Sequence, residues 1–396
     1  MQARVATVTR NAPFSHPNYS IHVKSEHMKS IIPPFGQVAM LALSLLAANL
    51  LGACSLMEDD LPACPQGLDL HFKYDYNLER ADMFTDHVGG VTVYLFDAEG
   101  RYLTEQSVAN TRTAQPLRDH NYRMHFDVAP GQYTYTAIAW QKPYAECLLA
   151  PGAKFRLTPP QAGGTQRDLS VTLDHIAAIA DTAVVVNAGQ PLDTLWHGYR
   201  TAPLTVVADE VTTDTVALVR DTKHVSVALR NVDEAENTDI ADFDIRIIDH
   251  NPTIGWDNSV NENAMLCYTP YRSWNTIDKS TDKQTKAEAA GQRGQIAHAD
   301  LMTSRLIDHG TDYRADGVLT VRNRRTGVEV IRVNLPDLLS RLRGSADLGM
   351  SAQEFLDRGY DYKLTFFLKG DRWAYVNVEI STLSWEVRHQ AEDIEP

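Results

Sequence analysis

Basic residues are the scarcer charged type in this chain of 396 residues. It holds 37 Lys and Arg against 51 Asp and Glu, which gives a formal net charge of −14. Proteins that bind nucleic acid neutralise phosphates with clustered Lys and Arg. The most basic short run, Arg322-Asn323-Arg324-Arg325, is better explained as a solvated turn. The composition therefore argues against a nucleic-acid partner.

The sequence also lacks the common motifs of catalysis and metal binding. It contains no Walker A loop, GxSxG, HExxH or glycine-rich dinucleotide loop, and no cysteine spacing of a zinc site. Five Asp-His dipeptides invite a metal or acid–base hypothesis, but successive residues of a strand point to opposite faces. They are Asp86-His87, Asp119-His120, Asp174-His175, Asp249-His250 and Asp308-His309. We expect no enzyme activity, no catalytic residue, no metal and no cofactor.

Only one apolar run is long enough to suggest a membrane-directed segment. Residues 38–53 carry no charge, yet the run is shorter than the ~20 residues of a membrane span and fits the core of a signal peptide. Leu51-Gly52-Ala53-Cys54 follow the pattern of a bacterial lipobox, in which the cysteine sulfur receives the lipid. An ordinary secretory signal, or a buried helix that ends at Cys54, is the alternative. We predict that residues 1–53 are a signal peptide with an upstream extension, and that Cys54 is lipidated.

An acidic cluster follows the predicted lipid site within residues 54–66, which we interpret as a lipidated tether. Glu58, Asp59 and Asp60 resemble the export signal that sends lipoproteins of Bacteroidetes-type bacteria to the outer cell surface. The alternative is a solvated, extended tether, because charged segments repel themselves and stay extended. We predict the export signal.

Cysteine is rare, with four residues in the chain: Cys54, Cys64, Cys147 and Cys267. Lipid attachment at Cys54 leaves three, which is an odd number for an oxidising compartment. We predict a Cys64–Cys147 disulfide that would staple the entry of the chain to the first sheet. Cys267 lies in an apolar context and is predicted to be a buried free thiol.

The rest of the chain is rich in short alternating strands with turns between them. Such runs include residues 68–74, 91–96, 133–140, 225–229, 243–248, 362–368 and 373–380. Two short helices are expected near residues 336–342 and 351–356, the second with Ser351 as its N-cap. This pattern predicts an all-β protein with two tandem β-sandwich domains, residues 67–203 and 204–396, and short helices in the second. Residues 275–300 are predicted to be a long polar surface loop.

Two aromatic features allow more than one interpretation. Trp196-His197-Gly198 lies near the predicted boundary, where packing of the tryptophan is the favoured explanation. Trp256, Tyr268, Tyr271 and Trp274 could form a platform for a ligand, although core packing explains them as well.

An ordered set of segments resembles the fimbrillin-associated anchor lipoproteins of Bacteroidetes-type bacteria, which hold type V fimbriae on the outer membrane. The segments cover residues 58–77, 88–103, 129–140, 218–232 and 352–368, together with the ending from Trp373 to Trp385. The resemblance implies transthyretin-like sandwiches and contact with fimbrial subunits by strand exchange. Trp385, Glu386, Val387 and Arg388 are the simplest candidates to take part, either by donating a strand or beside a groove that accepts one.

We therefore expect an outer-membrane lipoprotein that faces the outside, anchors fimbriae through fimbrillin-type subunits and limits their length. The alternative is a lipid-anchored adhesin that binds a carbohydrate or a host protein.

Overall fold

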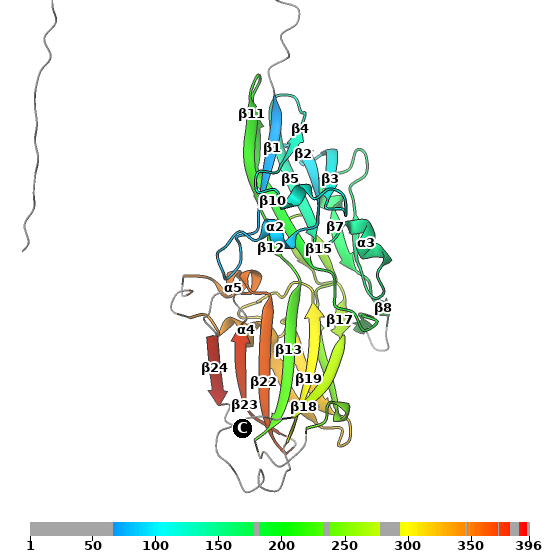
Figure 1. Ribbon diagram of the computed structural model, residues 1–396, viewed down its shortest axis with the longest axis vertical. Helices are drawn as coiled ribbons and strands as arrows, with labels where there is room; N and C mark the ends of the chain where they lie inside the picture. The colour runs from blue at the N-terminus through cyan, green and yellow to red at the C-terminus, as the bar shows by residue number, and fades with distance from the viewer. Residues whose placement is uncertain are drawn as a thin grey trace, which may run out of the picture. The chain divides into compact units, whose positions relative to one another are not determined.

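The computed structural model describes residues 66–177, 182–232, 238–277, 294–344, 347, 349–370, 372–380 and 388–393. Five β-sheets and a few short helices make up this part of the chain (Figure 1). Packed sheets without a helical layer form an all-β sandwich fold, as the sequence predicted. None of the helices in these residues has the length and apolar character that a membrane crossing requires.

The N-terminal half is a sandwich with a third, smaller layer. A three-stranded sheet has the order β11-β1-β4, a five-stranded sheet has the order β12-β10-β5-β2-β3, and a four-stranded sheet has the order β16-β15-β7-β6. The strands are β1 (Gly67–Lys73), β2 (Gly90–Asp97), β3 (Tyr102–Ala109), β4 (Arg123–Phe126), β5 (Gly131–Trp140), β6 (Phe155–Thr158), β7 (Ser170–Leu173), β10 (Leu195–Val206), β11 (Val211–Ala217), β12 (Val219–Arg220), β15 (Thr253–Gly255) and β16 (Val260–Asn261). The helical segments are α2 (Phe84–His87), η2 (Pro116–Arg118), α3 (Tyr144–Leu149) and η3 (Gln166–Asp168).

The middle layer explains the nearly uninterrupted burial of β2 and β5. Val93 and Ala137 belong to the core cluster that also contains β1, whereas Tyr94 and Ile138 belong to the cluster that contains Val171 of β7. Strands that are covered on both faces cannot show the polar alternation of a half-exposed strand. The sequence of β5, with nearly every residue buried, follows from that position.

The C-terminal half packs two six-stranded sheets against each other. Their orders are β18-β19-β13-β22-β23-β24 and β21-β20-β14-β17-β9-β8. The strands are β8 (Ile176–Ala177), β9 (Thr182–Val184), β13 (Lys223–Asn231), β14 (Phe243–Asp249), β17 (Met265–Tyr268), β18 (Arg272–Ile277), β19 (Gln295–Thr303), β20 (Val318–Asn323), β21 (Glu329–Asn334), β22 (Asp361–Lys369), β23 (Arg372–Ile380) and β24 (Arg388–Asp393). The helical segments are η4 (Ile240–Asp242), α4 (Leu335–Ser340) and α5 (Ala352–Arg358).

Both helices predicted from the sequence are present in this half. Ser351 Oγ accepts a hydrogen bond from the backbone N–H of Glu354 at 3.0 Å, so Ser351 is the N-cap of α5 as predicted. Asn334 caps α4 in the same way, and Pro336 occupies the first turn, where a missing N–H is tolerated.

The predicted boundary between residues 203 and 204 falls inside β10. Strand pairing also links the two halves, because β15 pairs with β7 and β9 pairs with β17. The register of β10 against β5 shifts between Arg200 and Leu204, around Pro203, and this irregularity accounts for the weak strand pattern there. The division at 203/204 stays a prediction, and the strands on its two sides are interleaved.

The predicted loop over residues 275–300 is wrong at both ends. Residues up to Ile277 belong to β18, and β19 begins at Gln295 and pairs with β13. These strands were not recognised because Asn275, Thr276 and His298 are polar. Their side chains lie on an exposed face or edge, where polar residues are compatible with a strand. The intervening residues 278–293 lie outside the described part of the chain.

A close backbone approach at Gly89 gives one stability prediction. A Cβ atom there would lie 2.2 Å from the backbone O of Gln141, whereas a Cβ at Gly349 would meet nothing within 4 Å. We expect Gly89→Ala to lower the free energy of unfolding by about 1–3 kcal/mol, because backbone cannot move aside as a flexible side chain can. Gly349→Ala is the control and should be close to neutral in chemical denaturation. Equal effects of the two substitutions would contradict the prediction.

Candidate functional site

The junction between the two halves holds a buried polar network. His197 Nδ1 and Asp221 Oδ2 are 2.6 Å apart, and both side chains are fully buried. Trp196 is buried beside them, with its ring 5.7 Å from the ring of Tyr74 in an edge-on arrangement. The structure therefore confirms packing of this tryptophan at the junction.

Lys223 is the largest buried charged side chain of the junction. Its Nζ donates hydrogen bonds to the backbone oxygens of Arg220, Asp357 and Gly359 at 2.9–3.1 Å. Three acceptors match the three protons of an ammonium group. Burial lowers the pKa of Lys223 to about 7, while the charges of Asp357 and Asp221 act to raise it. The lysine thus links β13 to the end of α5, although removing its ammonium group from water is unfavourable.

Arg305 and Asp357 form a second, bidentate contact next to Lys223. Arg305 Nε and Nη2 donate to the two carboxylate oxygens at 2.8 and 2.6 Å, and Arg305 Nη1 donates to the backbone oxygen of Asn258. Because Asn258 lies in the β15–β16 hairpin, the pair joins that hairpin to α5. These side chains hold one another and the backbone, so the network is structural.

The five Asp-His pairs do not assemble into one centre, because they lie on different elements. His309 has the most developed contacts: its Nε2 is 2.7 Å from Glu262 Oε1, and its Nδ1 is 2.8 Å from Asp316 Oδ1. Burial lowers the pKa of His309, but the two carboxylates outweigh it and raise the pKa above its usual value. Among the described residues, no group of three or more His, Cys, Asp or Glu side chains is placed to hold a metal ion.

The four aromatic residues proposed as a platform do not share one exposed face. Tyr268 is 1% exposed, and its hydroxyl donates to Asn251 Oδ1 at 2.6 Å. Trp256 packs against the core, and its ring meets Tyr199 edge-on. Trp274 stacks on His298 at 5.1 Å, with the guanidinium of Arg272 4.5 Å from its ring centre. Core and surface packing therefore account for these three rings.

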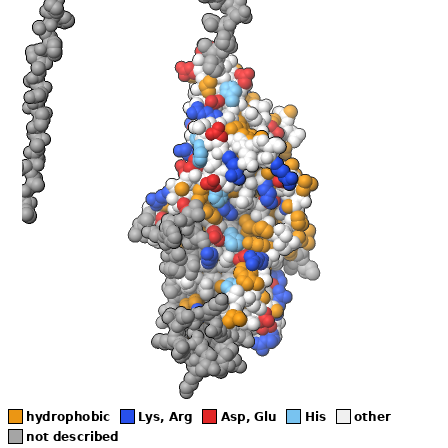
Figure 2. All heavy atoms as spheres, in the orientation of Figure 1, with side chains coloured by type: hydrophobic (Ala, Val, Ile, Leu, Met, Phe, Trp, Pro, Cys, Tyr) orange, Lys and Arg blue, Asp and Glu red, His pale blue; other side chains and the backbone are white. Residues whose placement is uncertain are grey.

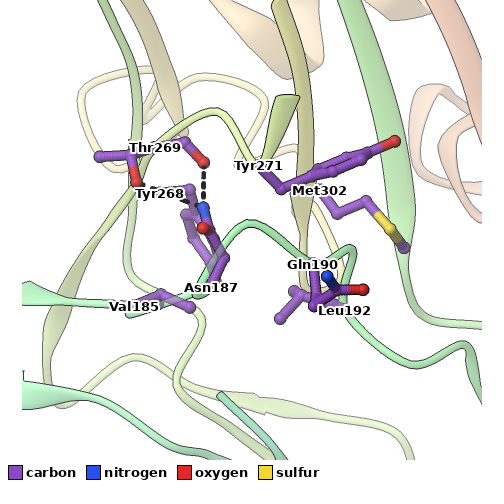
Figure 3. Close-up of a pocket in the computed structure, with 8 residues that line it drawn as sticks. All are labelled: Val185, Asn187, Gln190, Leu192, Tyr268, Thr269, Tyr271 and Met302. Carbon is purple, nitrogen blue, oxygen red and sulfur yellow. Dashed lines mark hydrogen bonds between the residues drawn. The ribbon is translucent and has the colours of Figure 1, made fainter. Parts of the chain in front are cut away.

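Tyr268 and Tyr271 line a small cavity (Figure 3). Figure 3 shows Asn187 beside Thr269, and Asn187 Nδ2 donates to the backbone O of Thr269 at 2.8 Å. The cavity measures ≈ 10 Å³, which is about the space of one water molecule. Small-molecule sites measure roughly 300–1,000 Å³, so this cavity is not one.

The C-terminal strand β24 forms an edge of the sheet β18-β19-β13-β22-β23-β24 (Figure 1). His224 N donates to Tyr360 O at 2.8 Å, so even-numbered residues of β22 face β13 and odd-numbered ones face β23. With Lys363 opposite Glu379, the alternation carries on through β23 to β24. Backbone groups of His389, Ala391 and Asp393 therefore point away from β23, and no strand among the described residues pairs with them, so this edge can pair with another strand.

A side groove lies on the same half, between β14 and the edge strand β18. Its lining residues are Ile240, Ala241, Phe243, Asp244, Ile245, Thr269, Pro270, Ser273 and Arg324, and its volume is ≈ 480 Å³. Since Arg324 N donates to Asp242 O, the backbone groups of Phe243 and Ile245 face the β17 side of β14. The pairing with β17 ends at Ile247, because the residue in line with Ile245 is Pro270, which has no N–H. The groove thus offers apolar side chains beside a stretch of strand that β17 does not cover.

Most of the residues singled out for lipidation, export and strand exchange lie outside the described residues. They are Cys54, Glu58, Asp59, Asp60, Cys64, Trp385, Glu386 and Val387. Arg388 is the first residue of β24. Sequence reasoning did not foresee that the strand continues to Asp393, since Ala391, Glu392 and Asp393 show no apolar alternation.

The predicted Cys64–Cys147 disulfide is not found, because Cys147 is a free, buried thiol. Its Sγ lies 3.8 Å from the backbone O of Lys142 and points into the core cluster around Trp140. Burial raises the pKa of the Cys147 thiol to about 11, which disfavours the reactive thiolate. Cys267 is a buried free thiol, as predicted.

Acidic and basic side chains are interspersed on the described part of the face shown in Figure 2. No curated protein matches the chain. Solved structures do: a candidate adhesin from Bacteroides thetaiotaomicron is 30% identical, with a TM-score of 0.64 and coverage of 83% of this chain and 99% of that one. A candidate polysaccharide-binding protein from the same organism is 27% identical, with a TM-score of 0.62 and coverage of 84% and 99%.

The fimbrial anchor protein Mfa2 from Porphyromonas gingivalis is 14% identical, with a TM-score of 0.53 and coverage of 83% of this chain and 100% of that one, so it shares the fold. The sequence model of the fimbrillin-A associated anchor proteins Mfa1 and Mfa2 matches residues 61–391. The match spans both halves of the described fold and confirms the resemblance found in the sequence. The chain belongs to the family of fimbrillin-A associated anchor proteins.

Proposed function

We propose that this chain is an outer-membrane lipoprotein that faces the outside of the cell, is attached through Cys54, anchors fimbriae and limits their length. Family membership supports a fimbrial anchor associated with the cell surface. The lipobox pattern that ends at Cys54 and the acidic cluster Glu58-Asp59-Asp60 support the lipid and the route.

The observation that carries the contact with a fimbrial subunit is the open edge of β24. Its outward backbone groups can hydrogen-bond an extended segment of a partner, and such pairing needs no particular side-chain sequence. β24 is itself paired with β23 along six residues. We therefore propose that it accepts the subunit's strand at its outer edge and does not leave the sheet.

The lipid anchor is tested by Cys54→Ala in cells. Without the acceptor sulfur, the protein should move from the membrane fraction to the soluble fraction, and fimbriae should appear in the medium, as measured by immunoblotting of both fractions. Cys64→Ala is the matched control, a nearby cysteine outside the lipobox, and should change neither fraction. Retention of the Cys54→Ala protein and of the fimbriae at the membrane would refute the anchor.

A second candidate function is that of a lipid-anchored adhesin for a carbohydrate or a host protein. A polar depression of ≈ 490 Å³ lies between α2, the segment after β3 and the start of α3. It is lined by polar groups that suit sugar hydroxyls, among them Asn110, Arg112, Gln115, Arg118 and Glu146. A glycan array with the mature chain and its Arg118→Ala variant tests this function. Binding that is lost in the variant would favour it, and an array without signal for the unsubstituted chain would exclude a carbohydrate.

A further inference from the structure

The strand that follows the predicted tether is bonded on both sides. Each of the seven residues of β1 has a register partner on β11, to which it runs parallel, and four of them have partners on β4. We propose that the β1–β11 pair is a mechanical clamp, which carries in shear the pull of a fimbria against the lipid at the N-terminus. This inference rests on the proposed function, since it takes the load to enter at the tether and to leave through the C-terminal half.

The direction of the two strands makes the loading a shear. β1 enters from the tether at Gly67, while β11 ends at Ala217 and leads through β12 into β13 of the C-terminal half. A pull between the tether and that half therefore acts on the N-terminal end of β1 and on the C-terminal end of β11. In parallel strands these ends lie at opposite ends of the pair, so the hydrogen bonds are stretched together and not one after another.

The hydrogen bonds of the clamp can be assigned from the alternation. Leu218 N donates to Lys73 O at 2.8 Å just past the end of β11, so Thr212, Asp214 and Val216 are the β11 residues whose backbone groups face β1. Thr213 and Thr215 face the other way, and β11 is the edge of its sheet. The strand thus offers neighbouring positions inside and outside the clamp.

Side-chain burial adds to the resistance. Leu68, Leu70 and Phe72 are between 0% and 2% exposed, and the ring of Phe72 stacks on Phe84 at 5.4 Å. Sliding β1 toward the tether would bring these side chains out of the core at the same time as the hydrogen bonds break. Exposure of large apolar side chains to water costs free energy, so the barrier is higher than the backbone bonds alone provide.

The segment after β1 forms a bracket, residues 74–83, that fastens the other end of the strand. Within it, Asn77 Nδ2 donates to Tyr74 O and Ala81 O, both at 2.8 Å. The bracket contacts the C-terminal half: the Arg358 guanidinium lies 3.9 Å from the ring centre of Tyr76, and Tyr360 donates to Glu79. Arg358 ends α5, which is followed by β22, and β22 pairs with β23 beside β24. The load path therefore joins the tether to the proposed fimbrial edge through paired strands.

Single-molecule force measurement on the mature chain tests the clamp through the direction of pulling. One handle is attached before residue 54, with Cys54 and Cys64 replaced by Ala. The second handle is a thiol at Thr326→Cys in the β20–β21 turn, which shears the pair, or at Ala208→Cys before β11, which peels it. Forced unfolding is governed by the unfolding rate, and we expect the first rupture to need at least about twofold more force in shear than in peeling. Equal forces, or a first rupture in the C-terminal half, would overturn the clamp.

A matched pair of variants tests the assigned hydrogen bonds. Thr212→Pro removes an N–H that faces β1, whereas Thr213→Pro removes one on the outer side of the edge strand. In shear, we expect a lower rupture force for Thr212→Pro and an unchanged force for Thr213→Pro. Should Thr212→Pro not fold, the comparison of pulling directions still decides the matter. A strong clamp in a chain whose Cys54→Ala variant keeps its fimbriae would refute the proposed function alone, and detached fimbriae with a weak clamp would refute the clamp alone.

Discussion

Asp357→Ala is expected to lower the free energy of unfolding by about 3–5 kcal/mol, because it leaves the Arg305 guanidinium buried without its carboxylate. The two side chains are only 14% and 8% exposed, and both guanidinium hydrogen bonds to the carboxylate are lost together. A domain's total stability is about 5–15 kcal/mol, so this single change removes a large share of it. The measurement is equilibrium denaturation followed by tryptophan fluorescence, since Trp196 lies at the same junction.

The control for this prediction is Asp337→Ala, which removes an exposed partner of Arg341. Those side chains are 46% and 48% exposed and four residues apart on α4, so the loss should be at most about 0.5 kcal/mol. The double variant Arg305→Met/Asp357→Leu removes both charges and should be more stable than Asp357→Ala. If Asp357→Ala and Asp337→Ala cost the same, the junction network contributes little to the fold.

The expected loss of stability shows how strongly the two halves of an anchor would be held together at this junction. The Arg305–Asp357 pair and two of the three hydrogen bonds of Lys223 end on α5 or on the residue that follows it. The bracket contacts the same place through Tyr76 and Glu79. The junction is thus held by buried charged groups, and their hydrogen bonds form in only one relative arrangement of the two halves. Such groups favour a fixed relation between the halves more than they favour overall stability.

The strands of the fold could be predicted because burial imposes a period of two on them. In β13, for example, Val225, Val227 and Leu229 are buried and alternate with less buried residues. Lys223 stands in phase with these residues, and that position was a readable sign that the lysine is buried. Its three carbonyl partners could not be foreseen, because they come from the end of β12, from α5 and from the residue after α5.

Two errors and one pairing that was not predicted have physical reasons of different kinds. β19 was hidden because it begins in a polar segment, yet Ala297, Ala299 and Leu301 alternate along it and are fully buried. The disulfide was inferred from counting, and counting carries no information on where the Cys147 thiol points. The parallel pairing of β1 with β11 joins segments far apart in the chain, and nothing local in either sequence specifies the partner.

The candidate site could be predicted from the sequence only in part, for a related reason. Strand pairing at an edge uses backbone groups, so the residues of β24 need not carry any recognisable pattern. The sequence indicated the C-terminal segment through its family resemblance. The structure adds the register against β23 and, with it, the residues whose N–H and C=O groups face outward.

Ala391→Pro is expected to release fimbriae while leaving the protein folded and attached to the membrane. The substitution removes an outward N–H from the middle of β24 and places a ring where an incoming strand would pair. A lost hydrogen bond of about 1 kcal/mol together with the steric clash should weaken capture by at least about tenfold. Gln390→Pro is the matched comparison, since its N–H faces β23, and it should disturb the sheet itself. The measurement is the amount of fimbrial protein in the medium, with thermal unfolding of each variant as a check on folding.

A reversible lock decides whether β24 accepts a strand or donates itself. Asn377 and Ala391 are register partners that do not share hydrogen bonds, and the Cα atoms of such a pair are about 4.5 Å apart, so Asn377→Cys/Ala391→Cys should form a disulfide. A locked β24 cannot leave β23, but its outer edge stays open. If β24 accepts the fimbrial strand, as we propose, locked cells keep their fimbriae under oxidising conditions. If fimbriae are instead lost when the lock forms and are regained on reduction, β24 is the donor, and the proposed acceptor edge is refuted.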